Sequence, residues 1–267
     1  MLLLLRRGGP RRTTINRPSR RRSSTPPVPP VPPVPTSTRV SVPYKRVRQH
    51  VNPFAGELRR LRPTPAQLHW PSRLASPGGP FHVDLGCAAG NYLFACARRA
   101  PGVNFVGLEI RRQLVDVADY RQRVRDRVPN LAFLHCNLLV PGALDAVLES
   151  MGSGNVRSVS VFHPDPNFKR RRKKRTVLTP ALAETLAKRL PAGAHVYLQS
   201  DVEPLFLEMA KVLQANPGFA PLADADVGRG PDFCSRRDNA MGVRTDREVS
   251  VLKQEGLEVW RKNFVKV

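Results

Sequence analysis

The chain has 267 residues, and its 44 Lys and Arg against 21 Asp and Glu give a formal net charge of +23. Hydrophobic residues make up 41% of the sequence, which is enough to bury a core and excludes a wholly disordered chain. No apolar run reaches the roughly 20 residues that a membrane-spanning helix needs. The four cysteines show no CxxC spacing, so we expect packed thiols and neither a metal site nor a disulfide framework.

The positive charge is concentrated in two segments. Residues 1–56 contain twelve Lys or Arg and no acid, and the run Lys169–Arg175 (KRRRKKR) adds seven consecutive cations. Elsewhere cations and acids are nearly balanced. The charge therefore belongs to two local features of an otherwise ordinary globular chain, and each needs its own explanation.

The composition divides the chain into three parts. Residues 1–40 are rich in Arg, Ser, Thr and Pro, a composition typical of an organellar transit peptide, and a disordered nucleic-acid-binding arm is the alternative. We therefore expect a chloroplast protein, with the mitochondrion as the second choice. Residues 41–80, interrupted by Pro and Gly, predict an irregular N-terminal extension with at most a short helix over 65–70. Residues 81–267 predict one folded domain.

Strand and helix patterns alternate along this domain. Apolar runs predict strands over 82–85, 103–108, 131–135, 156–162 and 194–199. Helical spacing predicts helices over 91–99, 111–127, 180–190 and 203–213. Such alternation indicates an α/β fold with a mostly parallel, doubly wound sheet, and the alternating residues 257–265 predict a final antiparallel strand.

Three successive predicted strands end in residues suited to a nucleoside ligand. Asp84 precedes a turn from Gly86 to Gly90, where small residues let a ligand approach the backbone. Glu109 ends the second strand, where a carboxylate can accept from two ribose hydroxyls, and Asn137 follows the third, where an amide can contact an adenine edge. The GxGxxG fingerprint and a Walker lysine are absent, so the set favours S-adenosylmethionine over NAD. The alternative for Glu109 is that it is a surface acid beside Arg111 and Arg112 and binds no ligand.

The fourth predicted strand ends at an acid between two prolines. Pro164 and Pro166 restrict the turn and so fix the direction of the Asp165 carboxylate. The run Lys169–Arg175 follows directly and would engage phosphates electrostatically, which favours contact with RNA over a merely solvated face. We expect Asp165 to lie at the same edge of the sheet as Glu109, because the carboxyl ends of parallel strands meet there.

Two later segments converge on the same edge. Asp201 ends the fifth predicted strand, and the segment before the last strand contains Thr245, Asp246, Arg247 and Glu248. A returning hairpin would bring that segment over the site. A helix capping box, with Thr as N-cap and Glu three residues later, is an alternative that can hold at the same time.

Together these residues resemble the tRNA (guanine-N7)-methyltransferase family of class I S-adenosylmethionine-dependent methyltransferases. The similarity covers roughly residues 80–265 together with RQHVNP at 48–53, which is similar to the organellar plant branch. The specific motifs are PDPNFKRRRKKR at 164–175, QSD at 199–201 and NAMGVRTDRE at 239–248. The resemblance implies methyl transfer from S-adenosylmethionine to N7 of guanine 46 in the tRNA variable loop, by a monomer or homodimer, with no metal and no membrane. A partner subunit is left open.

The resemblance also implies roles, position by position. It gives Asp84, Glu109 and Asn137 as cofactor contacts, and Asp165 as the active-site aspartate, also at the cofactor. Lys169, Asp201 and Thr245–Glu248 match the family's substrate-binding positions. The sequence departs from the family at Ala88, where a second glycine is frequent, at Asn167, where Trp or His is usual, and at His163, where Phe or Cys is common.

Guanine N7 has a lone pair and no hydrogen, so its methylation needs alignment and charge stabilisation but no general base. A carboxylate that accepts from guanine N1–H and N2–H₂ would supply both, and Asp165 and Asp201 are both candidates. Two other functions stay open. An amino-group methyltransferase is one, because Asp165-Pro-Asn-Phe168 is one residue from a DPPF-type motif. A non-catalytic RNA-binding protein that retains the fold is the other, with Ala88 as the feature that favours it.

Overall fold

The computed structural model describes residues 51–267 except 153, 168–169, 223–240 and 255–257. The predicted transit peptide, Lys169 and Cys234 therefore lie outside the described residues. The described residues belong to one compact unit, which spans Val40–Val267. Every described helix is too short or too polar to cross a membrane.

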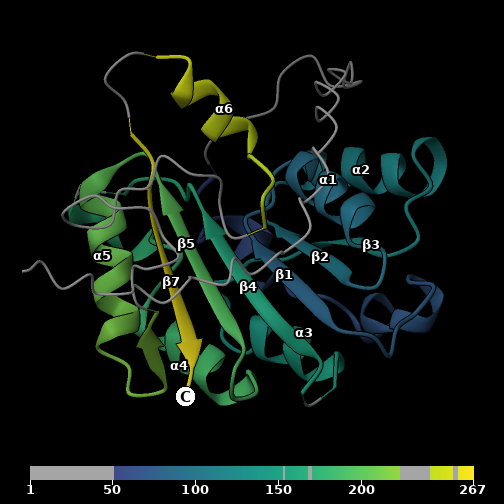
Figure 1. Cartoon of the computed structure of the whole chain (residues 1–267), viewed down its shortest axis with the longest axis horizontal. Coiled ribbons are helices and arrows are strands. Elements are labelled where there is room, and N and C mark those ends of the chain that lie inside the picture. The colour runs from purple at the N-terminus through teal and green to yellow at the C-terminus, as the bar shows by residue number, and fades with distance from the viewer. Residues whose placement is uncertain (1–50, 153, 168–169, 223–240, 255–257) are drawn as a thin grey trace, which may run out of the picture. The chain divides into compact units, whose positions relative to one another are not determined.

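The described part of the chain contains one seven-stranded sheet with the order β3-β2-β1-β4-β5-β7-β6 (Figure 1). Five neighbouring strands are parallel: β1 (Phe81–Leu85), β2 (Asn104–Glu109), β3 (Leu131–His135), β4 (Val156–Phe162) and β5 (His195–Ser200). β7 (Trp260–Lys266) runs antiparallel between β5 and β6 (Phe219–Pro221). The predicted α/β sheet with an antiparallel C-terminal strand is confirmed. The three-residue β6 was not predicted because so short a segment carries no alternating pattern.

Helices cover both faces of the sheet and enclose two apolar clusters. One cluster joins the sheet to α3 (Ala143–Ser150), α4 (Pro180–Arg189) and α5 (Glu203–Gln214). The other joins its opposite face to α1 (Asn91–Arg99) and α2 (Arg112–Tyr120). Neighbouring strand residues alternate between the clusters, as the period of two in a strand requires. This double covering explains why the strands read as nearly continuous apolar runs.

One predicted helix needs correction, and one helix was missed. The helix predicted over 111–127 ends at Tyr120 and continues as a π-helical turn, η4 (Arg121–Arg125). The turn is held by buried polar side chains, because Arg121 Nη1 donates to Asn91 Oδ1 at 2.5 Å and Gln122 Nε2 donates to the Val128 carbonyl at 2.8 Å. In addition, α3 was not predicted at all.

The N-terminal extension packs against the domain. It contains three short 3₁₀ turns: η1 (Gly56–Arg60), η2 (Pro65–Leu68) and η3 (Trp70–Ser72). Trp70 is buried, its ring lies 5.8 Å from that of Phe81, and its Nε1 donates to Ser150 Oγ at 3.0 Å. The extension thus contributes core residues, which its Pro-rich composition had not indicated.

The fold gathers the predicted site residues at one edge. Parallel β1, β2, β3, β4 and β5 all end there, and α6 (Asp246–Leu252) lies above the carboxyl ends of β4 and β5 (Figure 1). α6 therefore lies on the same side of the molecule as the carboxyl ends of the strands.

Candidate active site

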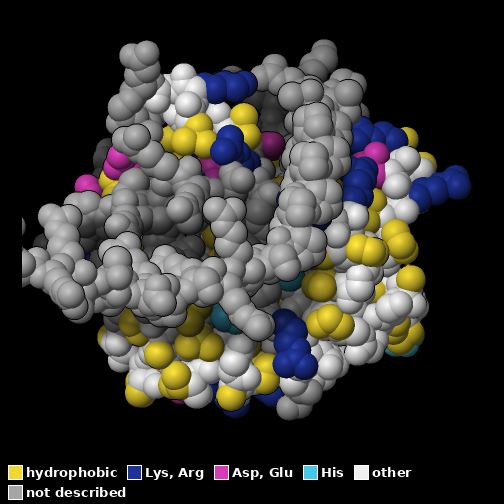
Figure 2. All heavy atoms as spheres, in the orientation of Figure 1, with side chains coloured by type: hydrophobic (Ala, Val, Ile, Leu, Met, Phe, Trp, Pro, Cys, Tyr) yellow, Lys and Arg dark blue, Asp and Glu magenta, His cyan; other side chains and the backbone are white. Residues whose placement is uncertain are grey.

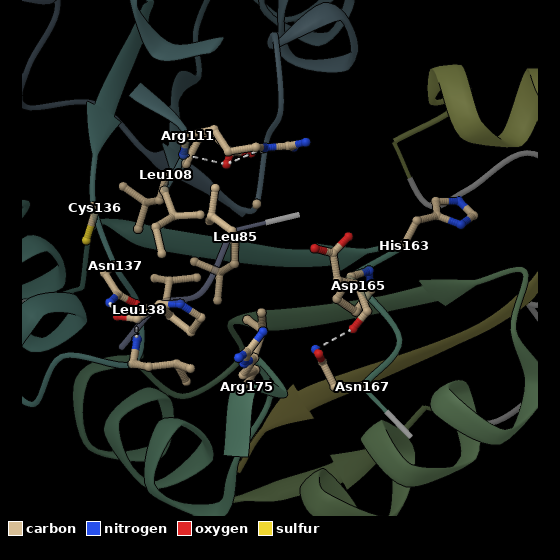
Figure 3. A pocket seen from close by; sticks show the side chains of 18 of the residues that line it. Leu85, Leu108, Arg111, Cys136, Asn137, Leu138, His163, Asp165, Asn167 and Arg175 are labelled. Atoms are coloured by element: carbon tan, nitrogen blue, oxygen red, sulfur yellow. Dashed lines mark hydrogen bonds and ion pairs between the residues drawn. The ribbon is translucent and has the colours of Figure 1, made fainter. Parts of the chain in front are cut away.

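A pocket opens at the carboxyl ends of the strands (Figure 3). Its wall includes Gly86 after β1, Glu109 at the end of β2, Asn137 after β3 and Asp165 after β4. Figure 3 shows the Asp165 carboxylate directed into the pocket, facing the side where Arg111 lies. The expected juxtaposition of Asp165 with Gly86 and Glu109 is therefore present. Had Asp165 lain at the far end of the sheet, one shared site would have been impossible.

The turn after β1 has a left-handed backbone at three positions. The φ angles are +95° at Gly86, +50° at Ala88 and +74° at Gly90. A Cβ atom on Gly90 would come within 2.4 Å of the Phe133 ring, whereas one on Gly86 would meet nothing within 4 Å. Gly90 is thus needed for packing, while Gly86 leaves space on its pocket side. Ala88 adopts a left-handed conformation that glycine takes more easily. This explains why a glycine would suit position 88, where the sequence departs from the family.

Glu109 is buried, and its carboxylate is held by hydrogen bonds. Oε2 accepts from the Ala88 N–H at 3.0 Å and from Arg111 Nη2 at 3.0 Å. Oε1 accepts from the Arg111 N–H at 2.9 Å and from Arg111 Nε at 3.0 Å. The alternative of a surface acid is therefore wrong, because only 3% of its side chain is exposed. The contact with ribose hydroxyls stays a prediction.

Asn137 ties the N-terminal extension to the pocket. Its Nδ2 donates to the carbonyls of Pro53, at 2.9 Å, and Leu58, at 2.7 Å, and its Oδ1 accepts from the Leu139 N–H at 3.0 Å. Val51 and Pro53 in turn line the pocket. Sequence reasoning missed this wall. Both amide hydrogens of Asn137 are donated to the extension, and its contact with adenine stays a prediction.

Asp84 is buried beneath the turn, outside the pocket wall, at the end of a hydrogen-bonded chain. Ser160 Oγ donates its hydrogen to Asp84 Oδ1 at 2.6 Å. The Ser160 hydroxyl oxygen therefore accepts from His82 Nε2 at 3.0 Å. The other ring nitrogen, His82 Nδ1, accepts from Ser158 Oγ at 2.8 Å. Burial lowers the pKa of His82 to about 3 and leaves the ring neutral. Burial also raises the pKa of Asp84 to about 7. The hydrogen bond from Ser160 lowers this pKa, and the negative charge of Glu109 raises it further. A cation nearby would stabilise this carboxylate.

Asp201 is held by two partners. Its Oδ1 accepts from His163 Nδ1 at 2.8 Å, and its Oδ2 accepts from Arg247 Nε at 2.9 Å and Nη2 at 2.5 Å. Burial alone would raise the pKa of Asp201, but these hydrogen bonds outweigh it and hold the pKa well below its usual range. Asp165, by contrast, is exposed and directed into the pocket. Asp165 lines the pocket and Asp201 does not, which favours Asp165 as the group that contacts a bound base.

The segment 245–248 forms the start of α6. Thr245 and Glu248 make the reciprocal bonds of a capping box, so that interpretation is confirmed. Glu248 also pairs with Arg261 of β7 and accepts from Gln199 Nε2 at 3.0 Å. At the other side, Asp246 Oδ2 accepts from Asn91 Nδ2 at 2.5 Å. These predicted substrate residues thus belong to a polar network that seats α6, and their contact with tRNA stays a prediction.

The cationic run forms a 3₁₀ segment, η5 (Arg170–Arg175), and its described side chains differ in environment. Lys174 Nζ lies 5.3 Å from the centre of the Phe54 ring, and Lys173 Nζ lies 3.1 Å from Glu208 Oε1. Arg175 turns inward and lines the pocket, and its buried Nε has no hydrogen-bond partner in the described part of the chain (Figure 3). Sequence reasoning treated the run as uniform and missed this residue.

The face seen in Figure 2 carries Lys and Arg side chains over α6 and over the region of α1 and α2, with acids between them. Ion pairs also lie along α2 and η4, where Arg112 pairs with Asp116 and Arg123 with Asp119. Within the described ranges, no three His, Cys, Asp or Glu side chains form a group that could hold a metal. The described cysteines are buried free thiols, and burial raises the pKa of Cys96 and Cys136 to about 12.

The known proteins to which this chain is similar are described as methyltransferases. A family model described as "Putative methyltransferase" matches residues 78–251. The tRNA (guanine-N(7)-)-methyltransferase of Trichormus variabilis is 38% identical over 228 residues, covering 85% of this chain and 99% of the relative. That of Synechococcus elongatus is 38% identical over 221 residues, covering 83% and 96%. The crystal structure of the antibiotic-resistance methyltransferase Kmr is 14% identical, with 77% and 94% coverage and a TM-score of 0.49. The chain belongs to the tRNA (guanine-N(7)-)-methyltransferase family.

Proposed function

We propose that this chain transfers the methyl group of S-adenosylmethionine to N7 of a guanine in tRNA. The observation that carries the proposal is the Asp165 carboxylate, directed into a pocket that it shares with Gly86 and Glu109. The similarity to the relatives named above covers nearly their whole length, and the family model spans residues 78–251, a range that includes Gly86, Glu109 and Asp165.

The residues present fit S-adenosylmethionine. The open side of Gly86 lets a ligand approach the backbone, and Leu85, Leu108 and Ile110 offer apolar contacts for an adenine ring. Glu109 would hold the ribose hydroxyls, and the buried carboxyl of Asp84 would gain from a cationic group close by. When bound, the cofactor supplies an electrophilic methyl group on a sulfonium.

The protein's own contribution is to hold the guanine. N7 attacks with a lone pair and releases no proton, so the pocket needs no general base, and the buried neutral His82 and the buried thiols agree with that. The Asp165 carboxylate would accept from guanine N1–H and N2–H₂. It would thereby align the ring and stabilise the positive charge that develops on it.

The test uses the full chain, labelled S-adenosylmethionine and tRNA that lacks 7-methylguanosine. We expect label in 7-methylguanosine after digestion to nucleosides and mass spectrometry. Label in methylated adenine or in methylated protein would instead support an amino-group methyltransferase. Calorimetry with S-adenosylmethionine alone distinguishes a methyltransferase from a non-catalytic RNA-binding protein. The latter would give no heat of binding with S-adenosylmethionine, although it would bind tRNA in a separate titration.

We further propose that the target is guanine 46 of the variable loop and that the enzyme works in the chloroplast, with the mitochondrion as the alternative. The support for the location is the Arg-, Ser- and Pro-rich, acid-free composition of residues 1–40. Reverse-transcription mapping of the methylated base tests the position. Imaging of a fluorescent protein fused behind residues 1–45 tests the location, and diffuse cytosolic fluorescence would contradict it.

A further inference from the structure

His163 occupies an unusual place between β4 and the turn that carries Asp165. Its backbone is left-handed, with φ +47°, and its side chain is only 8% exposed. A residue other than glycine persists in this conformation only when the surrounding structure holds it there. Its N–H donates to the Gln199 carbonyl at 2.8 Å, and both ring nitrogens have partners on β5 or at its end.

The neighbours of Gln199 determine which ring nitrogen carries the proton. Arg261 Nε donates to Gln199 Oε1 at 3.0 Å, and Gln199 Nε2 donates to Glu248 Oε2 at 3.0 Å. The amide orientation is therefore set, and Nε2 is the atom that faces His163 Nε2 at 2.7 Å. An amide nitrogen only donates, so His163 Nε2 accepts. His163 Nδ1 then carries the hydrogen and donates it to Asp201.

We propose that His163, as the neutral Nδ1–H tautomer, is a positioning residue for methyl transfer. It joins the turn of Asp165 to Asp201, and through Asp201 to the Arg247 guanidinium of α6. The inference rests on the proposed function, since it concerns how that site is aligned. It also assigns a use to a side chain that the family resemblance marks only as a departure.

The contacts explain why this joint would matter for alignment. His163 lies two residues before Asp165, and Pro164 and Pro166 restrict the chain between and after them. Arg247 donates twice to Asp201, yet its side chain is 55% exposed, so it reaches the solvent side of the site. Movement at His163 would therefore change the relative placement of an acid on one side and a cation on the other.

Two substitutions separate the two ring contacts. His163→Asn keeps an amide N–H near the place of Nδ1 and so keeps the donor to Asp201, whereas His163→Phe removes both contacts. For His163→Phe we expect kcat/KM for tRNA to fall roughly tenfold to hundredfold, as for the loss of a hydrogen bond to a charged group. His163→Asn should recover most of that loss. The dissociation constant of S-adenosylmethionine should stay unchanged in both variants.

Two further measurements distinguish positioning from a general structural role. In an Asp201→Asn background, His163→Phe should change kcat/KM by less than about twofold, because contacting residues that act together are not additive. In the wild type, ¹⁵N-resolved NMR of the imidazole, assigned with His163→Asn, should show a hydrogen on Nδ1.

Equal losses in the Phe and Asn variants, a parallel fall in cofactor affinity, or a hydrogen on Nε2 would each overturn the inference. Failure of the proposed function would look different, because the wild type itself would then transfer no methyl group to tRNA. An active wild type with an equally active His163→Phe variant would contradict only the role of His163.

Discussion

The two sides of the site are held in different ways. On the cofactor side, Glu109 accepts from the backbone N–H of Ala88 and from Arg111. Asn137 donates to the backbone carbonyls of Pro53 and Leu58 and so holds one wall of the pocket. On the acceptor side, Asp201 and Glu248 pair with arginines from other elements. The first side is thus held by backbone hydrogen bonds and one charge pair within a strand end, and the second by charge pairs between separate elements.

This difference teaches what each side is suited to do. A small ligand is recognised by a preformed concave shape with few polar groups, which the cofactor side provides. A nucleic acid is held through charge, and its base through a positioned carboxylate, which the acceptor side provides. The predictions below begin where the two sides should differ most.

Removing the charge of Glu248 should have the largest effect on stability. Its carboxylate pairs with Arg261, and their side chains are 0% and 5% exposed. Glu248→Gln removes the charge that pairs with this buried guanidinium, which should lower the free energy of unfolding by about 3–5 kcal/mol. Urea denaturation measures it. A change below 1 kcal/mol would show that the pair does not hold α6.

Asp84→Asn should raise stability in a pH-dependent manner. Because burial raises the pKa of Asp84 to about 7, the folded chain keeps a proton that the unfolded chain loses near pH 4. The wild type therefore loses stability as the pH rises from 4 to 7, by up to about 4 kcal/mol, and the amide variant should not. Denaturation at several pH values checks the sign. The same variant should bind S-adenosylmethionine more weakly at pH 7.5, since it lacks the charge.

Asn137→Ala should loosen the wall of the pocket. It removes the donors to the carbonyls of Pro53 and Leu58 and should lower the free energy of unfolding by about 2–3 kcal/mol. Because Val51 and Pro53 line the pocket, cofactor affinity should fall as well, which calorimetry measures. Unchanged affinity together with lost stability would mean that the wall does not touch the cofactor.

Arg112→Ala is the matched control for the buried charges and should have the smallest effect. Arg112 pairs with Asp116 at i,i+4, but their side chains are 68% and 36% exposed. Its loss should change the free energy of unfolding by less than about 0.5 kcal/mol. A loss as large as that of Glu248→Gln would remove the distinction between exposed and buried pairs.

The location of the site followed from the sequence, because parallel strands place their carboxyl ends together. Asp165, Glu109 and Gly86 therefore meet as expected, although Gly86 and Asp165 lie 79 positions apart in the sequence. The partners of these groups did not follow. Asn137 bonds to Pro53, 84 positions away, and His163 bonds to Asp201, 38 positions away. Such contacts depend on loop paths that no local pattern encodes.

Local patterns failed where buried polar groups override them. The helical spacing through 111–127 is real, but Arg121 and Gln122 bond inward and widen the last turn. The run Lys169–Arg175 reads as a uniform cationic surface, yet Arg175 turns into the pocket. The capping box at Thr245 was readable because its bonds lie within four residues.

The central claim is that the Asp165 carboxylate orients a guanine of tRNA in the pocket that binds S-adenosylmethionine. It is tested most directly by single-turnover methyl transfer at saturating cofactor and tRNA, comparing wild type with Asp165→Asn. We predict a rate of 7-methylguanosine formation at least about a hundredfold lower in the variant, with cofactor saturation checked for both proteins. A variant that forms 7-methylguanosine at the wild-type rate would contradict the account.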